Sequence, residues 1–228
     1  MLIVVPDVLT RDELAWCRQE LAGAGLADGR ATAGDLAARV KNNRQLPAES
    51  PVARRLGAAV LAALGRCALY HAAALPFRVL PPTFSRYDAG MEFGAHVDNA
   101  IRFMPDGEGA PLRADVSTTL MLSDPQDYAG GDLVIDDTYG SHRVQLAAGA
   151  MVVYPSSSLH RVEPVTGGVR WAAVLWAQSM VRDDGERTQL YELDRAIRAV
   201  RAGLGDDHAA VTPLVSHYHN LLRRWAEL

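Results

Sequence analysis

The chain has 228 residues, 49% hydrophobic and 22% charged, so it is long enough to bury a core, and its composition excludes disordered and fibrous classes. Its formal net charge of -4, without a polybasic stretch, disfavours electrostatic binding to nucleic acid or to an anionic membrane. It has no apolar run of the roughly 18 residues that a membrane span needs and no signal-peptide pattern. We interpret its two cysteines as free buried thiols, and together these features lead us to expect a cytoplasmic protein.

Two helix start signals mark the N-terminal third. Thr10 and Glu13 form a capping box, in which each side chain satisfies a backbone N–H of the first turn. Ser50 followed by Pro51 is the second signal, an N-cap before a proline at the first helical position. The only lysine of the chain, Lys41, lies between them, and we attribute the scarcity of lysine to genomic base composition rather than to chemistry. This third is therefore predicted to be support for a core that follows.

From residue 77 the pattern changes to short runs rich in Val, Thr, Leu and aromatic residues, separated by Gly, Pro and Asp. Eight strands are predicted, at 83–87, 93–98, 116–122, 132–135, 142–146, 150–154, 160–165 and 169–178. Their number and length favour a sandwich or jelly roll, and no helices fit between them as a parallel α/β sheet requires. Apolar stripes in the last stretch predict two packed helices. We expect an α+β fold with a jelly-roll domain at 77–180, an N-terminal helical support region at 1–76 and a C-terminal helical extension at 181–228.

A histidine and a carboxylate in one predicted strand are the first candidates for chemistry. His96 and Asp98 are two residues apart, so in a strand both side chains point to the same face and can converge on one ion. Chance alone gives about 0.5 such pairs in a chain of this composition, so the pair by itself is weak evidence.

A later histidine and arginine strengthen the case. His160 is followed by a predicted turn at 166–168 and then by Arg170, and a hairpin there would place both residues on neighbouring strands that open into one interior. Two histidines and one carboxylate form the facial triad of non-haem Fe(II) oxygenases, which leaves adjacent coordination positions open. These residues predict an iron site.

Arg170 is the candidate for holding an acidic co-substrate. A guanidinium is cationic, planar and able to donate two hydrogen bonds to one carboxylate. Its neighbours in the sequence are apolar, so it is hard to explain as solvated surface. The alternative is an inward ion pair with a carboxylate of the chain, because a buried charge requires a partner.

Taken together, these motifs resemble a known family. The residues 87–91 (YDAGM), 94–100 (GAHVDNA), 130–133 (GGDL) and 160–162 (HRV), followed by Arg170, are similar to those of PKHD-type hydroxylases, which belong to the prolyl 4-hydroxylase-like group of Fe(II)- and 2-oxoglutarate-dependent dioxygenases. The resemblance covers residues 77 to 180 and extends into both helical flanks.

The resemblance implies a double-stranded β-helix and a hydroxylase that uses Fe(II), O₂ and 2-oxoglutarate and releases succinate and CO₂. It implies iron at His96, Asp98 and His160 and 2-oxoglutarate at Arg170. Many relatives occur beside bacterial iron-uptake functions, and the substrate is expected to be a peptidyl, amino-acid or siderophore-like molecule. Ascorbate as an auxiliary cofactor and a homo-oligomer are left open.

In one respect the chain departs from the wider superfamily. Many members carry Ser or Thr two residues after the arginine, where this chain has Ala172. The missing hydroxyl must come from elsewhere, and Tyr87 and Thr118 are the candidates. Apolar walls are expected from Tyr154, Trp171 and Trp176, with ordinary core packing as the alternative.

The long segment at 99–115 directly follows the metal-binding motif. Loops of this length in compact domains are usually functional lids or disordered. We expect a substrate lid with Arg102 and Arg113 as contacts, and a passive loop is the alternative. Asn99 is a candidate for supporting the neighbouring ligand, or else a turn-forming residue.

Two other functions stay open on the sequence. A cupin-like metalloenzyme would use the same barrel and triad without 2-oxoglutarate, but it gives Arg170 no role. A non-catalytic barrel that binds iron or a small molecule leaves a triad with open positions unexplained.

Overall fold

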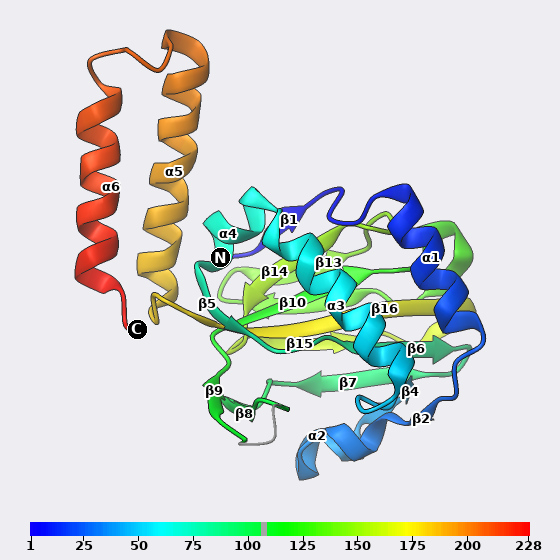
Figure 1. The fold of residues 1–228 in the computed structure, drawn as a ribbon. Helices are drawn as coiled ribbons and strands as arrows, with labels where there is room; N and C mark the ends of the chain where they lie inside the picture. The colour runs from blue at the N-terminus through cyan, green and yellow to red at the C-terminus, as the bar shows by residue number, and fades with distance from the viewer. Residues whose placement is uncertain (106–108) are drawn as a thin grey trace.

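A computed structural model describes residues 1–105 and 109–228 and contains two antiparallel β-sheets that pack face to face (Figure 1). The larger sheet has nine strands, in the order β1-β14-β10-β16-β6-β4-β2, with β5 and β11 also paired to β16. The smaller sheet has five, in the order β13-β12-β15-β7-β3, and β8 pairs with β9 in a separate hairpin. This is the mixed architecture of helices and antiparallel sheets that the sequence predicts.

The bounds of the elements are as follows. The larger sheet consists of β1 (Ile3–Val5), β2 (Ala27–Asp28), β4 (Arg44–Gln45), β5 (Pro76–Val79), β6 (Thr83–Asp88), β10 (Val116–Met121), β11 (Tyr128–Gly130), β14 (Met151–Pro155) and β16 (Val165–Ser179). The smaller sheet consists of β3 (Lys41–Asn42), β7 (Glu92–His96), β12 (Leu133–Asp137), β13 (Gly140–Val144) and β15 (Leu159–Val162), and the separate hairpin of β8 (Ile101–Phe103) and β9 (Pro111–Arg113). The helices are α1 (Arg11–Ala22), α2 (Asp35–Arg39), α3 (Pro51–Gly65), α4 (Ala68–Ala74), α5 (Asp184–Leu204) and α6 (Val211–Trp225), with short 3₁₀ turns η1 (Gly29–Thr32) and η2 (Pro125–Asp127).

The two faces of the larger sheet serve different purposes. On β10, alternate residues such as Val116 and Leu120 pack against α1, α3 and α4 in the main hydrophobic core. Residues of the opposite parity, such as Met121, point to the smaller sheet and form a second core with Leu133 and Ile135. Because successive side chains of a strand alternate between faces, one strand builds both layers. The space between the sheets is where the candidate site lies.

The predicted helix starts are present in the structure. The side chain of Thr10 accepts from the backbone of Glu13, and the reciprocal bond completes the capping box of α1. Ser50 caps α3 by accepting from Ala53, with Pro51 at the start of the helix. In the part of the chain that is described, both cysteines are free thiols.

One predicted connection is wrong. His160 and Arg170 were expected on the two strands of a hairpin, but β15 pairs with β12 on one side and β7 on the other, so neither edge is left for β16. The chain instead crosses from the smaller to the larger sheet at Glu163 and Pro164, and β16 begins at Val165. The two side chains therefore face each other from opposite sheets rather than lying side by side.

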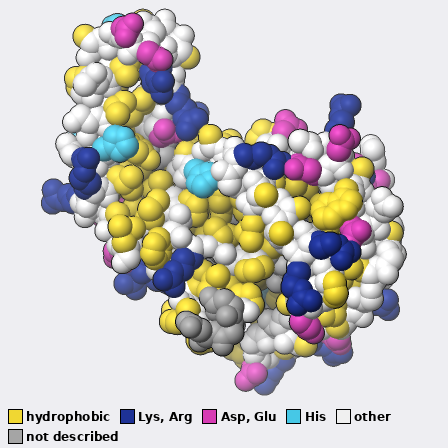
Figure 2. Space-filling model, viewed as in Figure 1, with side chains coloured by type: hydrophobic (Ala, Val, Ile, Leu, Met, Phe, Trp, Pro, Cys, Tyr) yellow, Lys and Arg dark blue, Asp and Glu magenta, His cyan; other side chains and the backbone are white. Residues whose placement is uncertain are grey.

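The C-terminal helices α5 and α6 form an antiparallel pair that stands to one side of the sheets (Figure 1). A small core of Leu75, Val181 and Leu190, with Leu222 and Trp225 packed against it, joins the pair to the body. Apolar side chains gather on this face of the pair and on the adjoining part of the body (Figure 2). Among the described residues no single helix is long and apolar enough to cross a membrane, although the bent pair α3 and α4 passes that test together on length and composition.

Candidate active site

Three potential metal ligands meet between the two sheets. His96 ends β7 and His160 lies opposite it on β15 as its cross-strand partner, with ring centroids 4.3 Å apart. Asp98 follows β7, and its Oδ2 lies 3.8 Å from Nε2 of His160. One ligand atom from each of the three residues lies within 4.8 Å of the others, so the group can hold one metal ion.

Both imidazoles are oriented by the backbone. Nδ1 of His96 lies 2.8 Å from the carbonyl oxygen of Gly94, and Nδ1 of His160 lies 3.0 Å from that of Ser158. A carbonyl only accepts, so each Nδ1 carries the proton and each Nε2 keeps its lone pair for a metal. Burial and, to a lesser extent, the neighbouring His160 lower the pKa of His96 to about 4, so the ring is neutral at physiological pH.

The carboxylate is oriented by a pair of buried serines. Ser117 of β10 donates to Oδ2 of Asp98 at 2.6 Å, and its own oxygen lies 2.8 Å from the hydroxyl of Ser156. The side chain of Asp98 is 8% exposed. Two imidazole nitrogens and a fixed carboxylate oxygen are the donor set of the facial triad, so the residues fit Fe(II).

Arg170 reaches the same cavity from β16 in the opposite sheet. It is 2% exposed, and among the described residues its Nε has no hydrogen-bond partner and a terminal nitrogen meets only the sulfur of Met121, at 3.7 Å. Within residues 1–105 and 109–228 no carboxylate pairs with this guanidinium, so the internal ion pair considered as an alternative is not formed. A buried cation without a counter-ion is costly, and the carboxylate of a bound acid would remove that cost.

Of the two hydroxyl candidates near Arg170, only one lines the cavity. Tyr87 is the cross-strand partner of Arg170, and the guanidinium carbon lies 5.4 Å from its ring centroid. Thr118 is buried on the opposite face of β10, so that expectation is wrong and its neighbour Thr119 lines the cavity instead. A further hydroxyl, missed in the sequence, belongs to Ser85, which lines the cavity and pairs across the strands with Ala172.

The expected contacts from the segment after Asp98 divide in two. Asn99 and Arg102 line the cavity. Arg113 does not, because its guanidinium binds Asp115 at 2.7 Å and Glu227 at 3.0 Å and so ties the hairpin to the C-terminus. The expected substrate role of Arg113 is therefore not supported. Residues 106–108 of the expected lid lie outside the described part of the chain.

Aromatic side chains close part of the wall. Trp176 and Tyr154 line the cavity as expected. Trp171 instead packs with the helix-side core, because it lies on the other face of β16. Phe93 stacks on His96 with ring centroids 3.6 Å apart and so covers one side of the proposed ligand.

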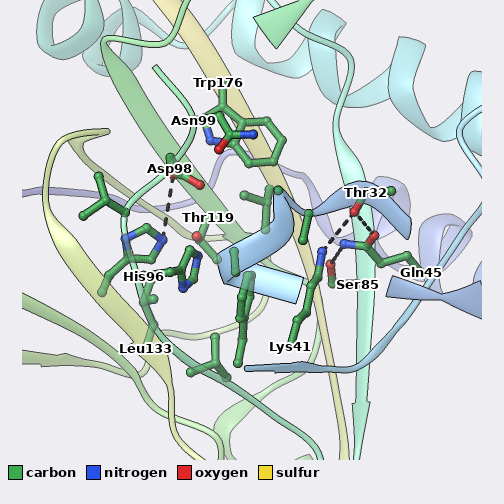
Figure 3. Close-up of a pocket in the computed structure, with 18 of the residues that line it drawn as sticks. Thr32, Lys41, Gln45, Ser85, His96, Asp98, Asn99, Thr119, Leu133 and Trp176 are labelled. Carbon is green, nitrogen blue, oxygen red and sulfur yellow. Dashed lines mark hydrogen bonds and ion pairs between the residues drawn. The ribbon is translucent and has the colours of Figure 1, made fainter. Parts of the chain in front are cut away.

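The N-terminal third also contributes to the site, although the sequence suggested only support. Lys41, Gln45 and Thr32 line the cavity. Figure 3 shows His96 and Asp98 on one side of it and Lys41, Gln45 and Ser85 on the other. The signal that could have indicated Lys41 is its uniqueness as the only lysine of the chain.

An open groove adjoins this cavity. Asn99, Arg102 and Trp176 line both. The far walls of the groove are apolar residues of α3, the turn at Pro81 and Pro82, and β8. The shared residues therefore lie where the groove meets the cavity that contains the triad.

Comparisons with known proteins agree with this geometry. Residues 82–178 match the 2OG-Fe(II) oxygenase superfamily, and residues 184–227 match the PKHD-type hydroxylase C-terminal domain. The chain is 64% identical to a PKHD-type hydroxylase of Cupriavidus metallidurans and 60% identical to one of Methylobacterium nodulans, over the full length of each pair.

Solved structures share the fold. A prolyl-4-hydroxylase of Pseudomonas putida is 23% identical with a TM-score of 0.51, and covers 78% of this chain and 92% of its own. A prolyl hydroxylase of Trichoplax adhaerens, solved with a peptide fragment, is 16% identical with a TM-score of 0.55, and covers 83% of this chain and 86% of its own. The predicted double-stranded β-helix core with flanking helices is confirmed.

Proposed function

This chain belongs to the PKHD-type hydroxylases and is a 2OG-Fe(II) oxygenase, and on that basis we propose that His96, Asp98 and His160 hold its Fe(II) while Arg170 binds its 2-oxoglutarate. The observation that carries the proposal is the buried, unpaired guanidinium of Arg170, which faces the three potential ligands across one cavity. A cupin-like enzyme without 2-oxoglutarate is not favoured, because it leaves this cation without a counter-ion.

The residues around Arg170 would complete the co-substrate site. The guanidinium would bind the carboxylate remote from the metal, because it is planar and can donate two hydrogen bonds. The hydroxyl of Ser85, on the strand beside Ala172, and that of Tyr87 are the groups we propose in place of the absent Ser or Thr. Burial raises the pKa of Tyr87, so its hydroxyl stays protonated and able to donate.

The chain's contribution to catalysis is binding, orientation and exclusion of water. When bound, the iron supplies the activation of O₂ that couples conversion of 2-oxoglutarate to succinate and CO₂ with hydroxylation of a substrate C–H bond. Nδ1 bonds of both histidines and the Ser117 bond fix the ligands before the metal arrives. Apolar walls from Phe93 and Trp176 keep the reacting C–H bond away from bulk water.

The substrate is proposed to be a peptidyl, amino-acid or siderophore-like molecule that reaches the triad through the groove at Asn99 and Arg102. A link to iron uptake, a cytoplasmic location, the use of ascorbate and the domain boundaries stay predictions.

The test of the metal site compares two histidine variants. His96→Ala is expected to abolish tight Fe(II) binding, measured by anaerobic titration, and to abolish succinate formation from 2-oxoglutarate, while circular dichroism keeps the helical signal. His142→Ala is the matched control, because His142 is exposed and paired with Asp137 away from the cavity. Tight Fe(II) binding by His96→Ala would refute the assignment.

A further inference from the structure

Two positive charges besides Arg170 face the candidate active site. Lys41 and Arg102 both line the cavity, and neither forms an ion pair with a residue in the described part of the chain. Asp98 is the only acidic residue among those lining the cavity in that part. The cavity therefore holds more positive charge than its own carboxylate can balance.

Lys41 is unusually placed for a lysine. It is 7% exposed, and its ammonium group donates one hydrogen bond, to the hydroxyl of Thr32 at 2.9 Å. Its nitrogen also lies 5.1 Å from the ring centroid of Phe93. An ammonium group has three donors, so two have no partner among the described residues. Burial and, to a lesser extent, the charge of Arg102 lower the pKa of Lys41 to about 8.

Arg102 presents its guanidinium to the same space from β8. The guanidinium carbon lies 3.4 Å from the ring centroid of Trp176, so the two groups are stacked. Stacking holds the guanidinium through its face and leaves its N–H groups, which point outward in its plane, available to an acceptor. No hydrogen bond joins those N–H groups to a residue in 1–105 or 109–228.

The charges of the occupied site can be counted if the function proposed above is correct. Asp98 and the carboxylate of 2-oxoglutarate next to the metal balance the two charges of Fe(II). The remote carboxylate balances Arg170. Among residues 1–105 and 109–228, Lys41 and Arg102 are left without a counter-ion, and two like charges that influence each other in a partly desolvated cavity repel. Neither the metal nor the co-substrate explains why both are there.

We propose that Lys41 and Arg102 bind an oxyanion of the substrate, a carboxylate or a phosphate, and thereby restrict this hydroxylase to anionic substrates. The site lies on the substrate side of the cavity, because Arg102 is shared with the groove that leads to the surface. An anion between the two cations satisfies unused donors of both and removes their mutual repulsion. The inference rests on the proposed function and adds to it the chemical class of the substrate.

The uniqueness of Lys41 gives a direct probe. Protein labelled with ¹³C-lysine yields one lysine side-chain signal, and Lys41→Met assigns it by removing it. The sample is loaded with Zn(II) in place of Fe(II) and with saturating 2-oxoglutarate, so that the Arg170 site is filled. Benzoate and its neutral analogue benzamide are then titrated in separate samples, as are phenyl phosphate and phenol.

The anionic member of at least one pair is expected to shift the Lys41 signal and to bind about 10-fold or more tightly than its neutral analogue, as a charge-assisted hydrogen bond implies. Which pair discriminates identifies the oxyanion as carboxylate or phosphate. Arg102→Met should remove most of that preference. Arg44→Met is the matched control, because Arg44 is exposed on β4 and does not line this cavity.

Several results would overturn the inference. One is equal affinity for the members of both pairs in the wild type, including no measurable binding of any. Another is equal loss of preference in Arg44→Met and Arg102→Met, which would indicate a general charge effect. A third is anion binding only when 2-oxoglutarate is absent, which would place the anion at Arg170. Binding of 2-oxoglutarate is followed in the same samples, so its failure would count against the proposed function, whereas failure of the probes alone would count only against the substrate class.

Discussion

Replacing Lys41 with Met should make the unliganded protein more stable. A pKa moved from the ordinary 10.5 to about 8 by burial means that the protonated side chain opposes folding, by about 3 kcal/mol. Methionine has a similar shape, no charge, and a sulfur that replaces the ammonium contact with Phe93. Loss of the hydrogen bond to Thr32 offsets about 1 kcal/mol, which leaves a net gain in the free energy of unfolding of about 2 kcal/mol at pH 7.

The pH dependence identifies the cause. Because the pKa of Lys41 is lower in the folded than in the unfolded chain, the unfolded chain binds more protons between pH 8 and 10.5, and wild-type stability rises relative to the variant over that range. The advantage of Lys41→Met is therefore complete below pH 8 and disappears by about pH 10. The charged groups acting on Lys41 are Arg102, which lowers its pKa, and Asp98 and Asp28, which raise it.

The assay is urea unfolding of metal-free wild type and Lys41→Met at pH 7 and pH 10. For a chain of this size, 2 kcal/mol corresponds to a rise in midpoint of about 1 M urea. A variant that is less stable than the wild type at pH 7, or one whose difference from the wild type does not change with pH, would refute the reasoning. A gain at pH 7 would mean that the fold accommodates this cation at a cost in stability, as expected of a residue kept for binding.

Two further substitutions probe the support of the site. Ser117→Ala removes the 2.6 Å hydrogen bond to Asp98 and should weaken Fe(II) binding, measured by anaerobic titration, by about 10- to 100-fold. The affinity for 2-oxoglutarate at saturating metal should change little. Unchanged metal affinity would contradict the role of Ser117 in orienting Asp98. Gly131→Ala adds a Cβ at a positive φ of 67°, placed 3.0 Å from Cδ of Arg170 and 2.8 Å from Val165, so calorimetry should show weaker 2-oxoglutarate binding and a lower melting temperature. Wild-type affinity in Gly131→Ala would show that the position of Arg170 is not critical.

Much of the core could be predicted because strand periodicity is a local property. All eight predicted core strands are present, with ends shifted by a few residues. His96 and Asp98 do converge on one site, although β7 ends at His96 and Asp98 lies just beyond the strand. Thr118 shows the limit of the same reasoning, because an error of one residue in parity moves a side chain to the other face of the sheet. Thr119 holds the inward position.

Other features depend on contacts that sequence patterns do not encode. The short connection after β15 looks like a hairpin, but both edges of β15 are already occupied by β12 and β7, so β16 must join the other sheet. Lys41 lies on a two-residue strand without periodicity, and only tertiary pairing with Phe93 on β7 brings it to the cavity. Arg113 and Arg102 lie in the same segment and were equally good candidates for substrate contacts in the sequence. In the structure the buried side chain of Asp115 forms an ion pair with Arg113 and holds it away from the cavity.

The most direct test of the central claim is the 2-oxoglutarate dependence of succinate formation in wild type and Arg170→Lys. Lysine keeps the charge of Arg170 but loses the two-pronged geometry, and the loss of one charge-assisted hydrogen bond costs about 1.5 to 3 kcal/mol. The apparent affinity for 2-oxoglutarate should fall about 10- to 150-fold, while Fe(II) binding, measured in the same preparations, stays unchanged. An unchanged 2-oxoglutarate dependence in Arg170→Lys would mean that the co-substrate binds elsewhere.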